Sequence, residues 1–141
     1  MSTPLEKSAP NDTGLVDATT ATFALYGDDL DPPALTALLG VSPTQAHRRG
    51  DANGRYAPFR TGAWLLTVEG KQVQPADLIA DLLQRLPDDP SLWEGLARDH
   101  RIEVRLGLFL EADDRGFDLS PELVMRLARY RAALNMDIYG T

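Results

Sequence analysis

Cysteine is absent from the 141-residue chain. The protein therefore has no disulfide, no thiolate metal ligand and no cysteine nucleophile. A domain of this length buries about two-thirds of the surface that its unfolded chain exposes, so one core is enough without cross-links. The lack of cysteine also agrees with a reducing compartment.

The common catalytic and nucleotide-binding motifs are missing too. The chain contains no GxSxG elbow, no P-loop and no GxGxxG fingerprint. Its two histidines, His47 and His100, lack metal-ligand spacing, and neither has an obvious paired nucleophile. We therefore name no catalytic residue and no cofactor, and expect a protein that is not an enzyme.

Long apolar runs are also missing. No stretch approaches the roughly 20 apolar residues that span a bilayer. Residues 1–19 lack the basic and apolar regions of a signal peptide. We expect a cytoplasmic protein with no membrane partner, in which residues 1–19 form a flexible tail and residues 20–141 a single domain.

The charge of the chain is acidic, with 21 Asp and Glu, 14 Lys and Arg, and a net charge of −7. An acidic domain is unsuited to non-specific nucleic-acid binding, for which a basic surface is typical. It suits a basic protein partner, such as a basic toxin. The alternative is that the acidity serves solubility alone.

Periodicity indicates a mixture of strands and helices. Alternation predicts strands at residues 20–26, 45–49, 63–68, 102–110, 117–119 and 136–139. Thr22 and Tyr26 share one face of the first of these strands, and Arg105 and Phe109 are expected on the exposed face of the fourth. Gly70 is expected to end the third of these strands, which spans residues 63–68.

Proline after a capping residue marks the helix starts, at Asp31-Pro32, Asp89-Pro90 and Ser120-Pro121, and another helix follows Pro75. The last helix is expected to include Leu134 and to end at Asn135.

The order of these elements predicts an α+β fold. We expect an antiparallel or mixed sheet with helices packed on one face, in which a ferredoxin-like βαββαβ core is extended by a β-α-β unit. The segments 45–49 and 137–139 could lie at sheet edges and pair with a second copy, so a monomer and a homodimer both stay open.

Asp28, Asp29 and Asp31 form an acidic turn after the first strand. Carboxylate oxygens suit Mg²⁺ or Ca²⁺, which makes these three residues the metal candidates. Their spacing is not that of an EF-hand loop, and Asp31 is placed to cap the next helix. Cap and turn chemistry is therefore the alternative explanation.

A basic segment follows, with His47, Arg48, Arg49, Arg55 and Arg60 as candidate ligand- or partner-binding residues. Arginine forks suit carboxylates and phosphates. The alternative is that Arg48 and Arg49 are solvated charges that discourage pairing at a sheet edge. Any functional surface is expected here, because this is the net-positive stretch of an acidic chain.

Four sequence blocks also occur in a specific order: FALYGDDLDPPALTALLG, HRRGD followed by TGAWLL, GFDLSPELVMRLA and LNMDIYG. In these blocks and their spacing, over residues 20–140, the chain resembles the bacterial DUF4279 family, a domain of unknown function. The resemblance implies a small bacterial α+β domain. It adds no catalytic residue.

Three hypotheses about function follow. The first is a non-catalytic cytoplasmic protein-binding module, for example an immunity-type protein that neutralises a toxin. The second is a regulatory domain that binds a small anionic ligand or nucleotide through Arg48, Arg49 and Arg60. The third is a metal-dependent hydrolase that uses Asp28 and Asp29.

Overall fold

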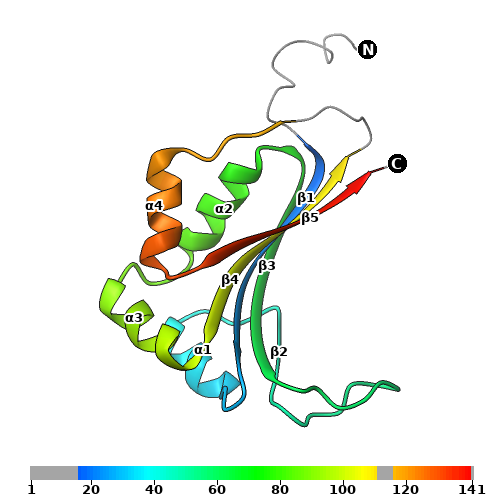
Figure 1. Cartoon of the computed structure of the whole chain (residues 1–141), viewed down its shortest axis with the longest axis vertical. Helices are drawn as coiled ribbons and strands as arrows, with labels where there is room; N and C mark the ends of the chain where they lie inside the picture. Colours follow the sequence, from blue (N-terminus) through cyan, green and yellow to red (C-terminus); the bar gives the residue numbers. More distant parts are fainter. Residues whose placement is uncertain (1–15, 111–115, 141) are drawn as a thin grey trace.

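The computed structural model of the protein describes residues 16–110 and 116–140 (Figure 1). Within them, helices pack against a single sheet. The strands are β1 (Val16–Gly27), β2 (Gln45–His47), β3 (Gly62–Val73), β4 (Arg101–Leu110) and β5 (Ala133–Gly140). The helices are α1 (Pro32–Leu39), α2 (Pro75–Gln84), α3 (Pro90–Asp99) and α4 (Pro121–Arg129).

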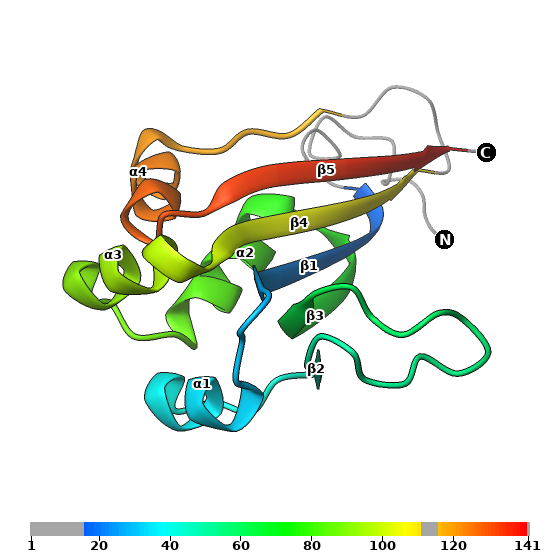
Figure 2. The same ribbon diagram turned by 60° about the horizontal axis from the view of Figure 1, so that its bottom comes forward.

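The sheet has the strand order β2-β3-β1-β4-β5, which Figure 2 shows from β2 at the bottom to β5 at the top. β1 is antiparallel to β3 and β4, and β2 is antiparallel to β3. β5 runs parallel to β4, so the sheet is mixed. This confirms the predicted α+β class. The ferredoxin-like comparison stays a prediction.

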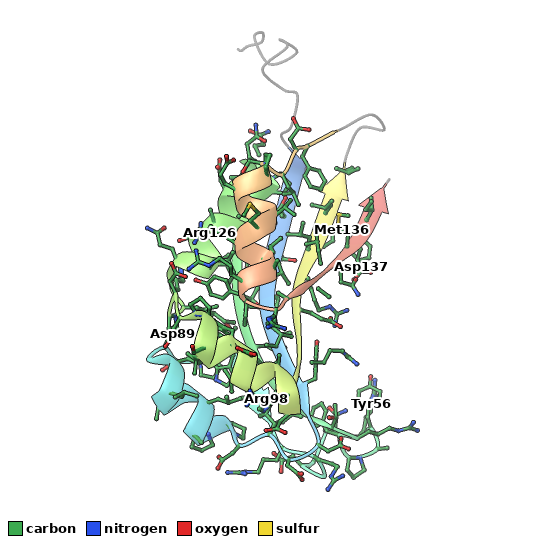
Figure 3. The ribbon with its side chains drawn as sticks, turned by 60° about the vertical axis from the view of Figure 1, so that its left-hand side comes forward. Tyr56, Asp89, Arg98, Arg126, Met136 and Asp137 are labelled. Carbon is green, nitrogen blue, oxygen red and sulfur yellow. The ribbon has the colours of Figure 1, made fainter. Side chains whose placement is uncertain are left out.

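Alternation along β1 decides which face of the sheet is buried. Phe23 and Leu25 are fully buried beneath the helices. Thr22 and Tyr26 point to the other face and are partly exposed. The neighbouring strands have the same buried and exposed faces, because directly opposed residues point to the same face. Figure 3 shows the helices on one side of the sheet, as predicted.

Three of the helices begin at the predicted caps. The side chains of Asp31, Asp89 and Ser120 accept hydrogen bonds from backbone N–H groups of α1, α3 and α4. Each cap precedes a proline, whose fixed φ suits the first helical turn. None of the helices in the described ranges is long and apolar enough to cross a membrane.

An aromatic cluster joins β1 to two helical segments. The rings of Phe23 and Trp93 have centroids 5.3 Å apart, and Tyr130 lies 6.1 Å from Phe23 and 5.2 Å from Trp93. Each polar ring group has a partner: Trp93 Nε1 donates to the Pro87 carbonyl at 2.7 Å, and Tyr130 Oη donates to the Leu83 carbonyl at 3.0 Å. Edge-to-face aromatic pairs add about 0.5–1.5 kcal/mol each beyond area burial.

The predicted end of the last helix is wrong. α4 ends at Arg129, and Arg131 has a φ of 59°, a left-handed conformation that stops the helix. Leu134 and Asn135 belong instead to β5, where Leu134 lies opposite Val104. Pairing with β4 outweighs the helical spacing of Leu134, which sequence periodicity alone could not reveal.

Other strand assignments also differ from the prediction. β2 ends at His47, so the predicted strand 45–49 is two residues too long. β3 continues past Gly70 to Val73, because this extension pairs with β1. Residues 117–119 do not form a strand. β1 starts at Val16, so the last residues of the predicted tail pair with β3, while residues 1–15 lie outside the described part of the chain.

Replacing Tyr130 with Phe should lower the free energy of unfolding by about 0.5–1.5 kcal/mol, because it removes one hydrogen bond to the Leu83 carbonyl, which keeps the backbone N–H of Leu86 as a donor. Chemical denaturation checks this. Tyr56→Phe is the matched control, since Tyr56 is 67% exposed. Equal stability of both variants and the wild type would show that the Tyr130 hydrogen bond contributes nothing.

Burial, with a smaller contribution from Asp88, raises the pKa of Tyr130 above its usual value of 10.0. The folded protein thus retains this proton at a pH where the unfolded chain loses it. The stability that Tyr130 contributes is complete below pH 10.0 and declines as the pH rises toward the folded-state pKa. Above pH 10.0, the wild type should lose stability more steeply than Tyr130→Phe in denaturation series; parallel profiles would contradict this.

Candidate functional site

The face of the sheet opposite the helices carries a group of polar and aromatic side chains, which we call the open face. Its centre is Arg105 on β4, which lies opposite Thr22 of β1 and Asn135 of β5. No helix in the described residues covers this face (Figure 3). The open face therefore presents side chains of all five strands of the sheet.

Arg105 connects two neighbouring strands. Its Nη1 donates a hydrogen bond to Tyr26 Oη at 3.0 Å, and its Nη2 lies 3.7 Å from Asp137 Oδ2. The hydrogen bond with Tyr26 is the main cause that raises the pKa of Arg105, so its guanidinium stays charged. With 45% of its side chain exposed, Arg105 keeps donors available for a further partner.

A shallow hollow of about 320 Å³ lies beside Arg105. Part of its floor is Gly107, where a Cβ atom would come within 2.7 Å of Thr20 Oγ1. The hydroxyls of Thr22 and Thr67 lie 2.8 Å apart and bond to each other. The lining also includes Tyr26, Gln45, Leu65, Phe109, Asp137 and Tyr139.

Two aromatic rings stand at one end of the hollow. Phe109 and Tyr139 are stacked, with centroids 4.8 Å apart and an interplanar angle of 13°. They are 43% and 50% exposed. At the other end, the Arg101 guanidinium lies 4.8 Å from the centroid of the Tyr26 ring. The open face thus combines flat apolar surface with charged groups of both signs.

The chemistry of this face suits binding. Thr22 and Thr67 bond to each other, so neither hydroxyl is held by a general base. No histidine is among the described residues that line the hollow. Arginine, tyrosine and phenylalanine are instead the residue types that are enriched in protein interfaces.

The two candidate clusters from the sequence lie next to each other. Arg48 Nη2 is 3.1 Å from Asp31 Oδ1. Arg49 reaches both Asp28, at 3.6 Å, and Asp29, at 3.9 Å. All five side chains are at least half exposed, so each ion pair contributes about 0–1 kcal/mol. The two arginines offset two of the three negative charges of the acidic turn.

The other basic candidates lie along the connection between β2 and β3. His47, in the last position of β2, stacks on Phe59 with centroids 3.4 Å apart. Arg55 lies over Tyr56 at 5.7 Å from the ring centroid, and Arg60 is exposed. In Figure 1 this connection extends away from the sheet. An anion bound here would have to compete with carboxylates for Arg48 and Arg49. Among the described residues, no carboxylate forms an ion pair with Arg60.

In the residues that the structure describes, no three or more His, Asp or Glu side chains are grouped to hold a metal ion. The acidic turn has other roles. Asp31 caps α1 by accepting from Ala34 N at 3.4 Å, and the three carboxylates form ion pairs with Arg48 and Arg49. The cap explanation of Asp31 is therefore confirmed.

Sequence alternation correctly placed Arg105, Phe109, Thr22 and Tyr26 on the less buried sides of their strands, but it did not identify the open face as a site. The missing information was the strand order. Only the position of β4 between β1 and β5 brings Arg105 to both Tyr26 and Asp137.

The fold and this face define a small α+β domain with an open-faced mixed sheet. The DUF4279 family, described as "Domain of unknown function (DUF4279)", matches residues 17–141. The chain therefore belongs to the DUF4279 family. Neither a curated protein nor a solved structure matches the chain.

Replacing Arg105 with Gln should change the free energy of unfolding by less than about 1 kcal/mol, because its partner Asp137 is half exposed and water solvates what remains. Thermal and chemical denaturation measure this. A loss of several kcal/mol would mean that Arg105 holds the fold together, and that it does not serve mainly as a surface group.

Proposed function

We propose that the protein is a non-catalytic binding module whose open face receives another protein. The observation that carries this proposal is the exposed Phe109–Tyr139 stack beside the charged, half-exposed Arg105. Side chains of this kind supply large contact area and directional hydrogen bonds in protein interfaces. On the side of Arg105 away from β5, Thr22 and Thr67 give a polar surface that tolerates exposure before the partner binds.

The shape of the site favours a protein over a small molecule. Pockets for small ligands bury most of the ligand surface, whereas this hollow is open and extends over several strands. Its polar groups do not converge on one point: Arg101 and Tyr26 lie at one end and Tyr139 at the other. A protein surface can contact all of them at once.

The charge of the chain supports a basic partner. A net charge of −7 attracts a basic protein over distances longer than direct contact and speeds its association. An immunity-type protein of the bacterial cytoplasm, bound to a basic toxin, is the specific form of the proposal that this charge favours.

The test compares two matched double variants as bait in a cell extract. Arg105→Gln with Phe109→Ser removes a charge and an aromatic from the open face, and both residues lie on β4. Arg98→Gln with Met125→Ser removes a charge and an exposed apolar side chain from the helical layer. We expect a partner that the wild type and the helical control retain and that the open-face variant loses.

Calorimetry with the purified partner then gives the size of the effect. The open-face variant should bind at least about tenfold more weakly, as expected when interface anchors are removed. Binding should also weaken as salt is added if the partner is basic. A partner that the open-face variant binds with unchanged affinity would place the interface elsewhere and contradict the proposal.

A further inference from the structure

β5 is an edge strand with an open outer side. It pairs with β4 on one side only, and no described residue pairs with the other (Figure 2). At the opposite edge, β2 spans only Gln45–His47. β5 is much longer, from Ala133 to Gly140, and thus offers a row of backbone N–H and C=O groups to another strand.

This edge lacks most of the features that prevent strands from pairing. Its sequence, ALNMDIYG, has no proline, lysine or arginine, and Asp137 is its single charge. Met136 and Ile138 are 47% and 63% exposed, although they lie opposite the buried Leu106 and Leu108 of β4. A long edge with exposed apolar side chains is a template for a further strand.

We propose that two copies of this chain pair through antiparallel β5 strands, related by a two-fold axis perpendicular to the sheet. Such an axis keeps the helices of both copies on the same face of one continuous sheet. It also means that a residue opposes one from the same face of the partner strand. Met136 lies on the face of the sheet that the helices cover, so it can oppose only residues on that same face of the partner strand.

Two registers would pair nearly the whole length of β5 with its copy, and the charge of Asp137 distinguishes between them. With Met136 opposite its own copy, Leu134 meets Ile138 and Asn135 meets Asp137. Apolar side chains then face apolar ones, and each carboxylate faces an amide that can donate to it. In the neighbouring register Asp137 opposes its own copy, and directly opposed like charges are destabilising.

This pairing changes the open face. Asp137 and Tyr139 line the hollow and lie on the edge strand. In the proposed register, Asn135 of the partner subunit lies across from Asp137. The second copy thus adds a polar side chain at the margin of each hollow and brings the two open faces onto one surface. Dimer formation does not depend on the proposed binding of another protein, and its tests need no partner.

Single-cysteine variants test the register, because the chain has no cysteine of its own. With a short bis-maleimide, Met136→Cys should form a cross-linked dimer severalfold faster than Tyr139→Cys, which lies on the same strand three residues from the two-fold axis and keeps Asp137. Met125→Cys on α4 is the control for random collision, since Met125 is 66% exposed and lies away from β5. Cross-linking of Met136→Cys no faster than of Met125→Cys would overturn the proposal.

A charge exchange at the same position tests the dimer itself. Sedimentation should show the wild type as a dimer that dissociates on dilution. Met136→Lys and Met136→Glu should each be monomeric, and an equal mixture of the two should recover the dimer, because opposite charges then meet across the axis. A wild type that is monomeric at every concentration, or a mixture that stays monomeric, would refute the pairing. Circular dichroism confirms that each variant is folded.

Discussion

The register of β1 between β3 and β4 is the constraint on which the other features depend. A slip by one residue would turn every side chain of β1 to the opposite face. The register is held because Phe23 must reach Trp93 and Tyr130 in the core beneath the helices. With Phe23 and Leu25 fixed there, Tyr26 has to point to the open face, where it meets Arg105 on the neighbouring strand.

The open face and the basic segment differ in how their charges are used. Around the acidic turn, Arg48 and Arg49 are both paired with aspartates, so neither of these two positive charges is left without a carboxylate. On the open face, Arg105 is only half covered and stands beside exposed aromatic rings. An acidic protein with this face has the charge to attract a basic partner and the apolar surface to hold it. The unpaired edge of β5 then places a second copy beside the same face.

Local chemistry explains which parts of this fold could be predicted from the sequence. The caps at Asp31, Asp89 and Ser120 depend on residues a few positions apart, and alternation over residues 102–110 depends on one strand alone. The end of α4, the extension of β3 and the start of β1 depend on pairing between distant segments. The site shows the same distinction. Alternation alone predicted that Arg105 is exposed, but its contact with Asp137 could not be predicted without the strand order.

Chemical-shift mapping is the measurement that tests the central claim most directly. Isotopically labelled protein is titrated with the partner that it retains from extract, and side-chain signals are followed in both the sheet and the loop between β2 and β3. The account predicts shifts centred on Thr22, Arg105 and Tyr139, with little change on the helices. Shifts confined to Arg48, Arg55 and their neighbours would contradict it and return the binding surface to the basic segment.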